Sequence, residues 1–471
     1  MNPWLDPNVL AVALGVVAGL LGILASGHAL LNKRRPRSAF GWIAVCLMFP
    51  LAGAVLYYLF GVNRSRRKAQ KLRDEGYFAA IRSVHAELSA DEAGALGRLG
   101  EALSGQPLLA GNAVELLRCG EEAYPAMLAA IDNARERILL SSYIFDTDQT
   151  GREFADALQR AVQRGVDVQV LLDGFGELYS FPRARRMLRK RGITVRRFLP
   201  PRLLPPSLMI NLRNHRKILL VDGQTAFTGG MNISDRHRLE LPGKSHRVVD
   251  VHFLLRGPVV ASLQSIFSGD WVFAGGEPVP DTPVTERAGP SLCRAIADGP
   301  DEELDRLLLL LVGTIGLARR RVAIMTPYFI PPRELLGALQ TAALRGVDVS
   351  LLLPEHNNLF FMHRATRHLL WELLQRGVRI YFQPGPFVHS KLLLVDDEYA
   401  QIGSANLDPR SLRLNFELNV EILDTQLAVS LGEHYQEARG RAREISLSEV
   451  DGRRLGTRLL DGLAWLFSPY L

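Results

Sequence analysis

The strongest constraint on the fold is an internal duplication, in which two stretches of the chain repeat the same residues in the same order. Residues 161–173 read AVQRGVDVQVLLD, and residues 342–354 read AALRGVDVSLLLP. Farther along, residues 215–222 (HRKILLVD) match residues 389–396 (HSKLLLVD). The two pairs are offset by 181 and 174 positions, as expected for related units with loops of different length. We therefore expect two copies of one structural module.

Each copy alternates between helix and strand patterns in the way that is typical of an α/β fold. Helical patterns at 152–164 and 333–345 end at a glycine, and short apolar runs follow them. Apolar runs without alternation indicate strands that are covered on both faces. The sequence therefore predicts two α/β lobes that pack as a pseudo-twofold pair, over residues 110–290 and 291–445.

The N-terminal region predicts a membrane anchor. Residues 8–31 and 39–60 contain no Lys, Arg, Asp or Glu, and each run exceeds the ~20 residues that a helix needs to cross a bilayer core. We expect a transmembrane helical hairpin over residues 1–63. The alternatives are a buried pair of core helices, which is rarely so long and uncharged, and a cleaved signal peptide, whose basic start is missing from Met1–Asn8.

Two glycines and a proline add detail to the predicted hairpin. Gly15 and Gly19 lie four residues apart and would let the helices pack closely. Pro50 removes a backbone donor from the second run, so we expect a kink there.

Positive charge is concentrated beside the apolar runs. Residues 1–73 hold ten Lys or Arg and one acid, which leaves 46 basic and 48 acidic residues over 74–471, or −2 of the total +7. The charge therefore points to an anionic lipid surface rather than to nucleic acid. Six basic residues follow the second run and four lie between the runs, which favours a cytoplasmic catalytic body: Arg64, Arg66, Arg67, Lys68, Lys71 and Arg73 against Lys33, Arg34, Arg35 and Arg37.

Two further segments complete the domain plan. Residues 64–109 are polar and predict a helical connector. Residues 446–471 form a tail with an apolar end that contains Trp465, Phe467 and Tyr470. We favour docking of this tail on the body over contact with the membrane surface.

Each copy begins an apolar run with a histidine and a lysine two residues apart, His215 with Lys217 and His389 with Lys391. Residues i and i+2 of a strand share a face, so each pair presents an imidazole and an ammonium to the same side, and the intervening residue points away. Seven of the 56 basic residues are lysines, yet two of them occupy these matched positions.

Glycine-led turns, 229–232 and 403–406, would bring Asn232 and Asn406 close to the two pairs. Two lysines and two amides suit the oxygens of a phosphate group. Two histidines suit a two-step displacement in which one attacks phosphorus and the other carries the proton. No carboxylate cluster has metal-ligand spacing, so we expect no metal and no cofactor.

The repeated pattern H-x-K-x4-D-x6-G-[GS]-x-N resembles that of the phospholipase D superfamily. With two apolar segments before it, the chain resembles the bacterial cardiolipin synthases of the two-span, two-motif type over essentially its whole length. The motif is specific for the superfamily and less so for the synthases, because hydrolases, nucleases and phosphatidylserine synthases share it. The resemblance implies a multi-pass inner-membrane phosphatidyltransferase that converts two phosphatidylglycerol molecules into cardiolipin and glycerol.

The resemblance also implies a role for each motif residue. We favour His215 as the nucleophile that forms a phosphatidyl-histidine and His389 as the acid and base, and the reverse assignment stays open. The phosphate oxygens would be held by Lys217, Lys391, Asn232 and Asn406. Asp222 and Asp396, although part of the catalytic motif, look structural.

In this family a carboxylate accepts a hydrogen bond from the second ring nitrogen of each histidine. Asp250 matches for the first copy and Glu417 for the second, so we expect Asp250 behind His215 and Glu417 behind His389. A strand-end surface acid is the alternative for either. Gly230 departs from the commoner serine, which Ser404 keeps, and this change leaves the assignment intact.

Two features suggest how substrate arrives. Residues 181–221 hold twelve Lys or Arg and no acid, and we expect this stretch to steer anionic lipid, although most charge runs are solvated faces. The apolar segments 199–210 and 359–362 are interpreted either as core packing or as an entrance for acyl chains.

Three other functions remain to be separated from the synthase. A phospholipase D would let water attack the intermediate, and a nuclease is disfavoured by the membrane hairpin. A non-catalytic lipid-binding scaffold is disfavoured because both motifs are intact. The sequence leaves the alcohol acceptor and a homo-oligomeric state open.

Overall fold

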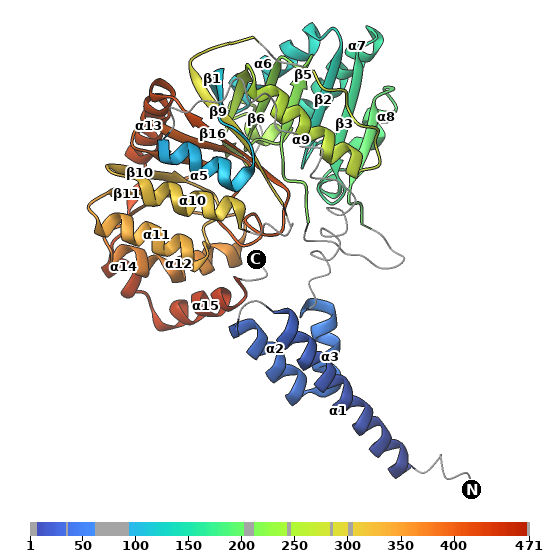
Figure 1. Cartoon of the computed structure of the whole chain (residues 1–471), viewed down its shortest axis with the longest axis vertical. Helices are drawn as coiled ribbons and strands as arrows, with labels where there is room; N and C mark the ends of the chain where they lie inside the picture. The colour runs from blue at the N-terminus through green and yellow to red at the C-terminus, as the bar shows by residue number, and fades with distance from the viewer. Residues whose placement is uncertain are drawn as a thin grey trace. The chain divides into compact units, whose positions relative to one another are not determined.

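A computed structural model describes residues 7–33, 36–61, 94–201, 212–242, 246–282, 286–299 and 305–468. The chain divides into two compact units, Met1–Lys71 and Leu72–Leu471 (Figure 1). Most of the predicted connector, including the six basic residues that follow the second apolar run, lies outside the described residues. Its described part contains one helix, α5 (Gly94–Ser104).

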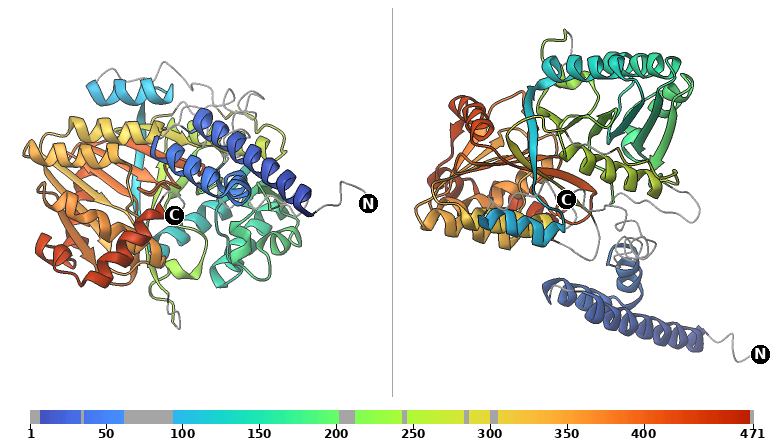
Figure 2. Two further views of the ribbon diagram at one scale, coloured as in Figure 1. Left: turned by 90° about the horizontal axis from the view of Figure 1, so that it is seen from below. Right: turned by 45° about the horizontal axis from the view of Figure 1, so that its top comes forward.

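The first unit consists of helices that pack side by side (Figure 2). The first apolar run forms one helix, α1 (Pro7–Asn32), whose residues Val9–Asn32 are the one stretch among the described residues that is long and apolar enough to cross a membrane. The second run is divided into α2 (Pro36–Met48), α3 (Pro50–Leu56) and the π-helical turn η2 (Tyr57–Gly61).

The division of the second run occurs at Phe49, where the backbone leaves the helical region with φ −131° and ψ 72°. Pro50 is the first residue of α3, a position where its missing N–H is not needed. The close helix contacts use other glycines than expected. A Cβ on Gly22 would lie 2.7 Å from the Cys46 carbonyl and one on Gly53 would overlap the Val45 carbonyl, whereas Gly15 and Gly19 have no neighbour within 4 Å.

The second unit contains one continuous fifteen-stranded sheet whose strand order is symmetric about its centre. From the centre outward, the first half runs β1 (Leu109–Arg118), β8 (Val251–Arg256), β6 (Thr225–Gly229), β5 (Ile218–Val221), β2 (Arg137–Ser142), β3 (Asp167–Asp173) and β4 (Thr194–Phe198). The second half runs β9 (Ser291–Asp298), β16 (Glu417–Leu423), β15 (Tyr399–Gly403), β14 (Leu392–Val395), β10 (Arg321–Met325), β11 (Asp348–Pro354), β12 (Arg379–Gln383) and β17 (Arg443–Glu444).

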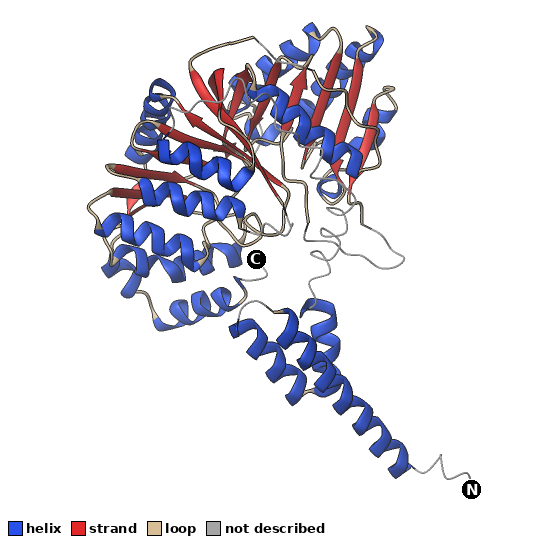
Figure 3. Cartoon of the chain, in the orientation of Figure 1, coloured by secondary structure: helices blue, strands red, loops and turns tan. Residues whose placement is uncertain are grey.

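Helices cover both faces of each half-sheet (Figure 3). The first lobe contributes α6 (Cys119–Asn133), α7 (Gln149–Gln163), η5 (Gly176–Tyr179), α8 (Ala184–Arg189), η6 (Asp235–His237) and α9 (Val259–Phe273). The second contributes α10 (Arg306–Leu317), α11 (Arg333–Leu344), α12 (Phe360–Leu374) and α13 (Thr425–Gly440). The predicted two-lobed α/β fold is confirmed.

The repeated helix–glycine–strand segments adopt the same local structure. Gly165 follows α7 with φ +88° and Gly346 follows α11 with φ +89°. This left-handed conformation favours glycine because it has no Cβ. In both lobes the following strand is parallel to its neighbour, β3 beside β2 and β11 beside β10, which fixes both helix-to-strand connections at equivalent places.

The two lobes share a hydrophobic core. One buried cluster combines Phe253 and Phe267 of the first lobe with Val420, Leu431 and Tyr435 of the second. Burial of such side chains stabilises the folded state by roughly 1.5–3 kcal/mol each. The lobes are therefore held together by core packing as well as by the sheet.

The C-terminal tail forms two helices, α14 (Leu447–Asp451) and α15 (Leu455–Leu466). α15 packs on α12, as Figure 1 also shows. The buried carboxylate of Asp461 pairs with Arg364 at 2.9 Å and with Arg453. The tail docks on the second lobe, and Tyr470 lies outside the described residues.

Candidate active site

The two His–Lys pairs occupy equivalent positions at the start of two central strands. His215 and Lys217 directly precede β5, and His389 and Lys391 precede β14. His215, Lys217 and Lys391 are buried and the His389 side chain is 12% exposed, and the pKa of each responds to charges from the other lobe. The fold therefore brings the duplicated residues together at the junction of the lobes.

Each histidine is bonded to the carboxylate of the opposite lobe. His215 Nδ1 lies 3.0 Å from Glu417 Oε2, and His389 Nδ1 lies 2.8 Å from Asp250 Oδ2. The expected pairing within each copy is therefore wrong, because the carboxylates are exchanged. A carboxylate at Nδ1 holds the proton there and leaves Nε2 to face the reaction.

Backbone hydrogen bonds between the lobes produce this exchange. The His215 amide donates to the Phe416 carbonyl at 2.9 Å, one residue before Glu417. The His389 amide donates to the Val249 carbonyl at 2.8 Å, one residue before Asp250. A two-stranded parallel ribbon, β7 (Val248–Val249) with β13 (Phe387–Val388), extends the second contact. The backbone next to each histidine is therefore hydrogen-bonded to the backbone just before the carboxylate that the histidine contacts.

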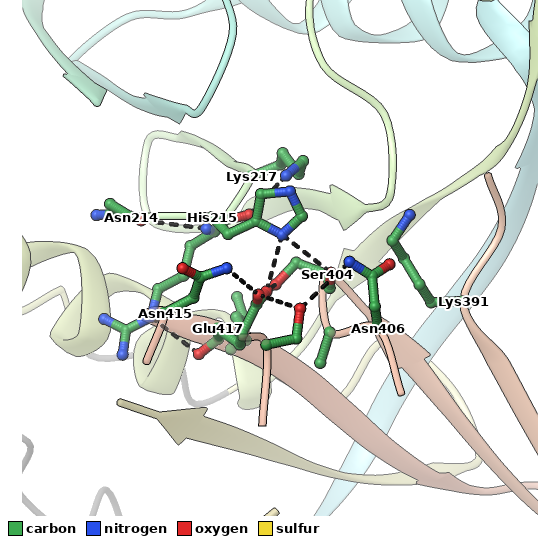
Figure 4. Close-up of polar contacts among 12 residues, drawn as sticks. Asn214, His215, Lys217, Lys391, Ser404, Asn406, Asn415 and Glu417 are labelled. Carbon is green, nitrogen blue, oxygen red and sulfur yellow. Dashed lines mark hydrogen bonds and ion pairs between the residues drawn. The ribbon is translucent and has the colours of Figure 1, made fainter. Parts of the chain in front are cut away.

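Glu417 receives donors on both of its oxygens (Figure 4). Besides the His215 ring, Ser404 Oγ donates to Oε2, while Ser411 Oγ at 2.9 Å and Asn415 Nδ2 at 3.2 Å donate to Oε1. Burial alone would raise the pKa of Glu417, but His215, Lys217 and the Ser404 hydroxyl lower it below its usual value. The carboxylate is accordingly stabilised as the anion that orients His215.

Asp250 is closely packed and accepts fewer side-chain hydrogen bonds than Glu417 does. Its Oδ1 accepts the Val251 amide at 2.8 Å, and burial raises its pKa despite the nearby Lys391. A Cβ on Gly230 would overlap both Asp250 oxygens. Glycine at position 230 therefore leaves room for the shorter, closely packed carboxylate, whereas the serine at the matching position 404 is a donor to Glu417.

The lysines are buried cations beside the rings. Lys217 Nζ donates to the His215 carbonyl at 2.6 Å, and Lys391 Nζ lies 3.2 Å from His389 Nε2. Burial lowers the pKa of Lys217 to about 7 and that of Lys391 to about 8. Burial also lowers the pKa of His215, and burial together with Lys391 and Lys217 lowers that of His389 well below its usual value. An anionic ligand between the lysines would reverse much of this effect.

The two asparagines lie on the glycine-led turns, as the spacing predicts. Asn232 Oδ1 accepts the Ile144 amide at 3.2 Å, and Asn406 Nδ2 donates to Ser411 Oγ at 3.2 Å. Ser411 also donates to Glu417. The amide of Asn406 is thus linked to the group that holds His215.

The motif aspartates are not brought to the histidines. Asp222 and Asp396 follow β5 and β14 at the ends opposite the His–Lys pairs, with φ +51° and +55°. Asp222 accepts three consecutive backbone amides at 2.8–2.9 Å, from residues 135–137, and Asp396 accepts those of residues 319–321 at 2.7–2.8 Å. Each clamps the start of the neighbouring strand.

One buried ion pair at the site was not predicted from the sequence. Arg216, which points away from the reacting groups, is 1% exposed and lies 2.5 Å from Asp270 of α9. Its guanidinium also donates to the carbonyls of Glu417 and Asp298, both at 3.0 Å. Asp270 is the one charged residue of the helix 259–273, and this is the sequence signal for the pair.

Two tyrosines contact the histidines. The Tyr143 ring packs edge-on against His215 with centroids 5.1 Å apart, and Tyr328 packs edge-on against His389 at 6.3 Å. Tyr143 follows β2 and Tyr328 follows β10, which are equivalent strands of the two lobes. They form an aromatic wall on each side of the site.

The basic stretch before the first motif is only partly available for steering. Arg185 pairs with the nearly buried Glu177 at 3.4 Å, and Arg191 with Asp156 at 2.8 Å. Arg213 is buried against Asp173. Residues 202–211, most of the predicted apolar loop, lie outside the described residues.

Two lobes that share one sheet and place paired His–Lys motifs at their junction define the phospholipase D class of fold. The crystal structure of phosphatidylserine synthase from Haemophilus influenzae is similar to this chain, with a TM-score of 0.63, 17% identity, and coverage of 80% of this chain and 100% of that one. At this identity the similarity concerns the fold.

Sequence comparison defines the family more closely. The profile described as cardiolipin synthase, PLD-like domain matches residues 127–271 and 311–438, and the profile described as phospholipase D-nuclease N-terminal matches residues 20–61. Cardiolipin synthase A of Pseudomonas putida is 35% identical over 99% of both chains. The major cardiolipin synthase ClsA of Bacillus subtilis is 31% identical over 96% of this chain and 98% of its own. The chain belongs to the cardiolipin synthase family of the phospholipase D superfamily.

Proposed function

We propose that the protein is a cardiolipin synthase that transfers a phosphatidyl group from one phosphatidylglycerol to another. The observation that carries the proposal is the exchanged pair of His–carboxylate bonds with two buried lysines between the lobes, in a chain of this family. The site has two imidazoles whose Nδ1 atoms face carboxylates and two buried cations beside them, as a two-step displacement at phosphorus requires.

In the first step His215 Nε2 attacks the phosphorus of the donor lipid, forming a P–N bond while the P–O bond to glycerol breaks. The departing glycerol oxygen takes a proton from His389 Nε2. Glu417 holds the proton on His215 Nδ1 and stabilises the positive charge that develops on the ring. Lys217, Lys391, Asn232 and Asn406 hold the non-bridging oxygens.

In the second step the primary hydroxyl of a second phosphatidylglycerol gives its proton to His389 Nε2 and attacks the same phosphorus. The P–N bond breaks, which restores His215 and releases cardiolipin. A phosphodiester anion beside Lys391 and Lys217 offsets the charges that hold the pKa of His389 low, so that His389 can carry the proton. Asp250 keeps that ring in one orientation.

The membrane arrangement is also a proposal. α1 would form the first crossing, and α2 to η2 the second, because 26 residues from Pro36 to Gly61 reach about 39 Å at 1.5 Å per residue, more than the hydrocarbon core. The break at Phe49 would shorten this reach. The six-to-four excess of basic residues supports a cytoplasmic body in a bacterial inner membrane, and reporter fusions at residue 471 and at residue 34, between the two apolar runs, test it.

The reaction is tested with the full chain in detergent and phosphatidylglycerol as the sole lipid. Cardiolipin and glycerol in equal amounts are expected. Phosphatidic acid in place of cardiolipin would identify the hydrolase, and no turnover would contradict any enzymatic function. His215→Asn should abolish turnover, whereas His434→Asn, a change on α13 away from the paired motifs, should preserve it.

A further inference from the structure

The part of the molecule that the proposed reaction leaves unexplained is a set of exposed apolar side chains around the active site. Soluble surfaces rarely gather large apolar residues without a partner. Three segments carry them: η5 and the residue Phe181 in the first lobe, the start of α12 in the second lobe, and the helix α15.

The first two segments lie at the same place in the two lobes. Leu178, Tyr179 and Phe181 follow β3, and Phe181 is 94% exposed. Leu359, Phe360 and Phe361 follow β11 and are all exposed. Since β3 and β11 occupy equivalent positions in the sheet, the duplicated fold presents one apolar cluster from each lobe.

Both clusters lie at the edge of the sheet that holds the histidines. β2 is parallel to β3, and β5 is antiparallel to β2, so the start of β5 and the end of β3 share an edge. The same holds for β14 and β11 in the second lobe. Aromatic contacts complete the path in the first lobe, where Tyr179 lies 6.3 Å from Tyr143, which packs on His215.

In the second lobe, the docked tail takes part in the contacts that connect the apolar cluster to His389. Tyr328, which packs on His389, also packs on a small buried cluster that includes Met362 and Ala365 of α12 and Ala464 of α15. The Tyr328 hydroxyl donates to Asn358 at 2.8 Å, directly before the exposed Leu359. α15 is therefore part of the wall beside the active site.

α15 turns an apolar stripe outward. Its inner face carries Asp461 and Ala464, both buried. At 100° per residue its outer stripe consists of Leu455, Leu459, Leu463 and Leu466, each more than half exposed. A helix with such a stripe and basic flanks is typical of one that lies in a bilayer interface.

The arginines beside the apolar stripe favour an anionic lipid surface as the partner that covers it. Arg454 and Arg458 are exposed beside the stripe, and Asp461, the one acid between residues 454 and 468, is buried in its arginine pairs. The first-lobe cluster continues directly into the basic residues 183–191. An apolar stripe bordered by arginines is complementary to acyl chains below an anionic headgroup layer.

We infer that the outer stripe of α15 and the two clusters form a docking surface on an anionic bilayer, which places the junction of the lobes against the headgroups. The inference rests on the proposed function, because a lipid substrate is what brings the bilayer to this site. It adds a role for the tail: α15 is an interfacial helix that holds the second lobe on the membrane.

The test places a nitroxide label on Leu459→Cys in the full chain, reconstituted in nanodiscs that contain phosphatidylglycerol. The label on Leu344→Cys is the matched control, because Leu344 and Leu459 are both 65% exposed and Leu344 ends α11 at the opposite edge of the sheet. The three native cysteines are buried. Docking predicts that the label at 459 collides with oxygen more than with a water-soluble nickel chelate, and that the label at 344 does the reverse.

Two outcomes would overturn the docking surface. Equal accessibility to the nickel chelate at both positions would place α15 in water. Dipolar broadening between labels at 459, absent at 344, would identify a second copy of this chain as the occupant. Neither outcome depends on turnover, so the docking surface can fail while the proposed function stands.

A second measurement uses activity. Leu459→Glu with Leu463→Glu should lower the rate on phosphatidylglycerol bilayers by about tenfold or more, because two carboxylates would enter the interface, and should leave the rate on monomeric short-chain phosphatidylglycerol unchanged. Leu344→Glu should change neither rate. Equal rates on bilayers for both variants would contradict the role of α15, and absence of turnover in the unaltered chain on either substrate would contradict the proposed function instead.

Discussion

The two lobes repeat the same motif but support their histidines differently. His215 is held by Glu417, which has three further side-chain donors, and the adjacent Arg216 is locked to Asp270. His389 is held by Asp250 beside a glycine, and the residue after it is Ser390. Duplication thus supplied two histidines, and their surroundings made one more rigidly positioned than the other. A rigid ring suits the nucleophile, which must be aligned with phosphorus.

The largest difference between the lobes is expected from the two carboxylates. Glu417→Gln replaces the carboxylate that fixes the His215 proton with a neutral amide and should reduce kcat roughly 10³–10⁴-fold, in the manner of other His–carboxylate pairs. Asp250→Asn should reduce kcat less, about 10²-fold. Initial rates of cardiolipin formation measure both. A larger loss for Asp250→Asn would reverse the assignment of the two histidines.

A smaller effect is expected from the buried ion pair of Arg216, a residue whose place in the second lobe is taken by Ser390. Arg216→Met removes the cation that pairs with the buried Asp270, and breaking such a pair costs about 3–5 kcal/mol. The change should lower the thermal unfolding temperature and also kcat, because Arg216 donates to the carbonyl of Glu417. Ser390→Ala is the matched change, since Ser390 Oγ is buried without a hydrogen-bond partner among the described residues. It should leave both quantities nearly unchanged, and an equal loss would show that the lobes do not differ here.

Substitutions at Gly230 and at the matching Ser404 should lower kcat to different extents. Gly230→Ala would push the Asp250 carboxylate away from its place behind His389, so kcat should fall about tenfold, less than the roughly 10²–10⁴-fold of a complete acid–base contribution. Ser404→Ala removes one of several donors to Glu417 and should cost a few-fold, or about 1 kcal/mol. Circular dichroism controls for folding. A harmless Gly230→Ala would contradict the close approach of Asp250.

The smallest expected difference between the lobes is in how their two lysines make kcat/KM depend on pH. The pKa of Lys217 is about 7 and that of Lys391 about 8, so both cations lose protons as pH rises from 6 to 9 and kcat/KM, which reports the free enzyme, should fall over this range. kcat should fall less, because bound phosphate favours the charged lysines. Lys217→Arg should lower kcat/KM at pH 6 but flatten its decline, since arginine stays charged. An unchanged slope in that variant would exclude Lys217 as the titrating group.

The sequence predicted the lobes, the His–Lys pairs and the asparagines because each is encoded within one copy of the repeat. It did not predict the exchange of Glu417 and Asp250, because the exchange depends on backbone bonds of His215 and His389 to the opposite lobe, which no pattern within one copy displays. Arg216 and Asp270 were missed for a related reason: they are 54 residues apart and meet only when α9 packs on the sheet. The break at Phe49 exceeded the expected kink because Pro50 begins a new helix.

The most direct test of the account is to find which histidine carries the phosphatidyl group. Phosphatidylglycerol labelled in its phosphate is mixed with the full chain, the reaction is quenched in base, which preserves phosphohistidine, and tryptic peptides are analysed. The account predicts label on His215, in the fragment that ends at Arg216, with none on His389 or in the His215→Asn variant. Label on His389 in the fragment that ends at Lys391 would contradict the division of roles between the two lobes.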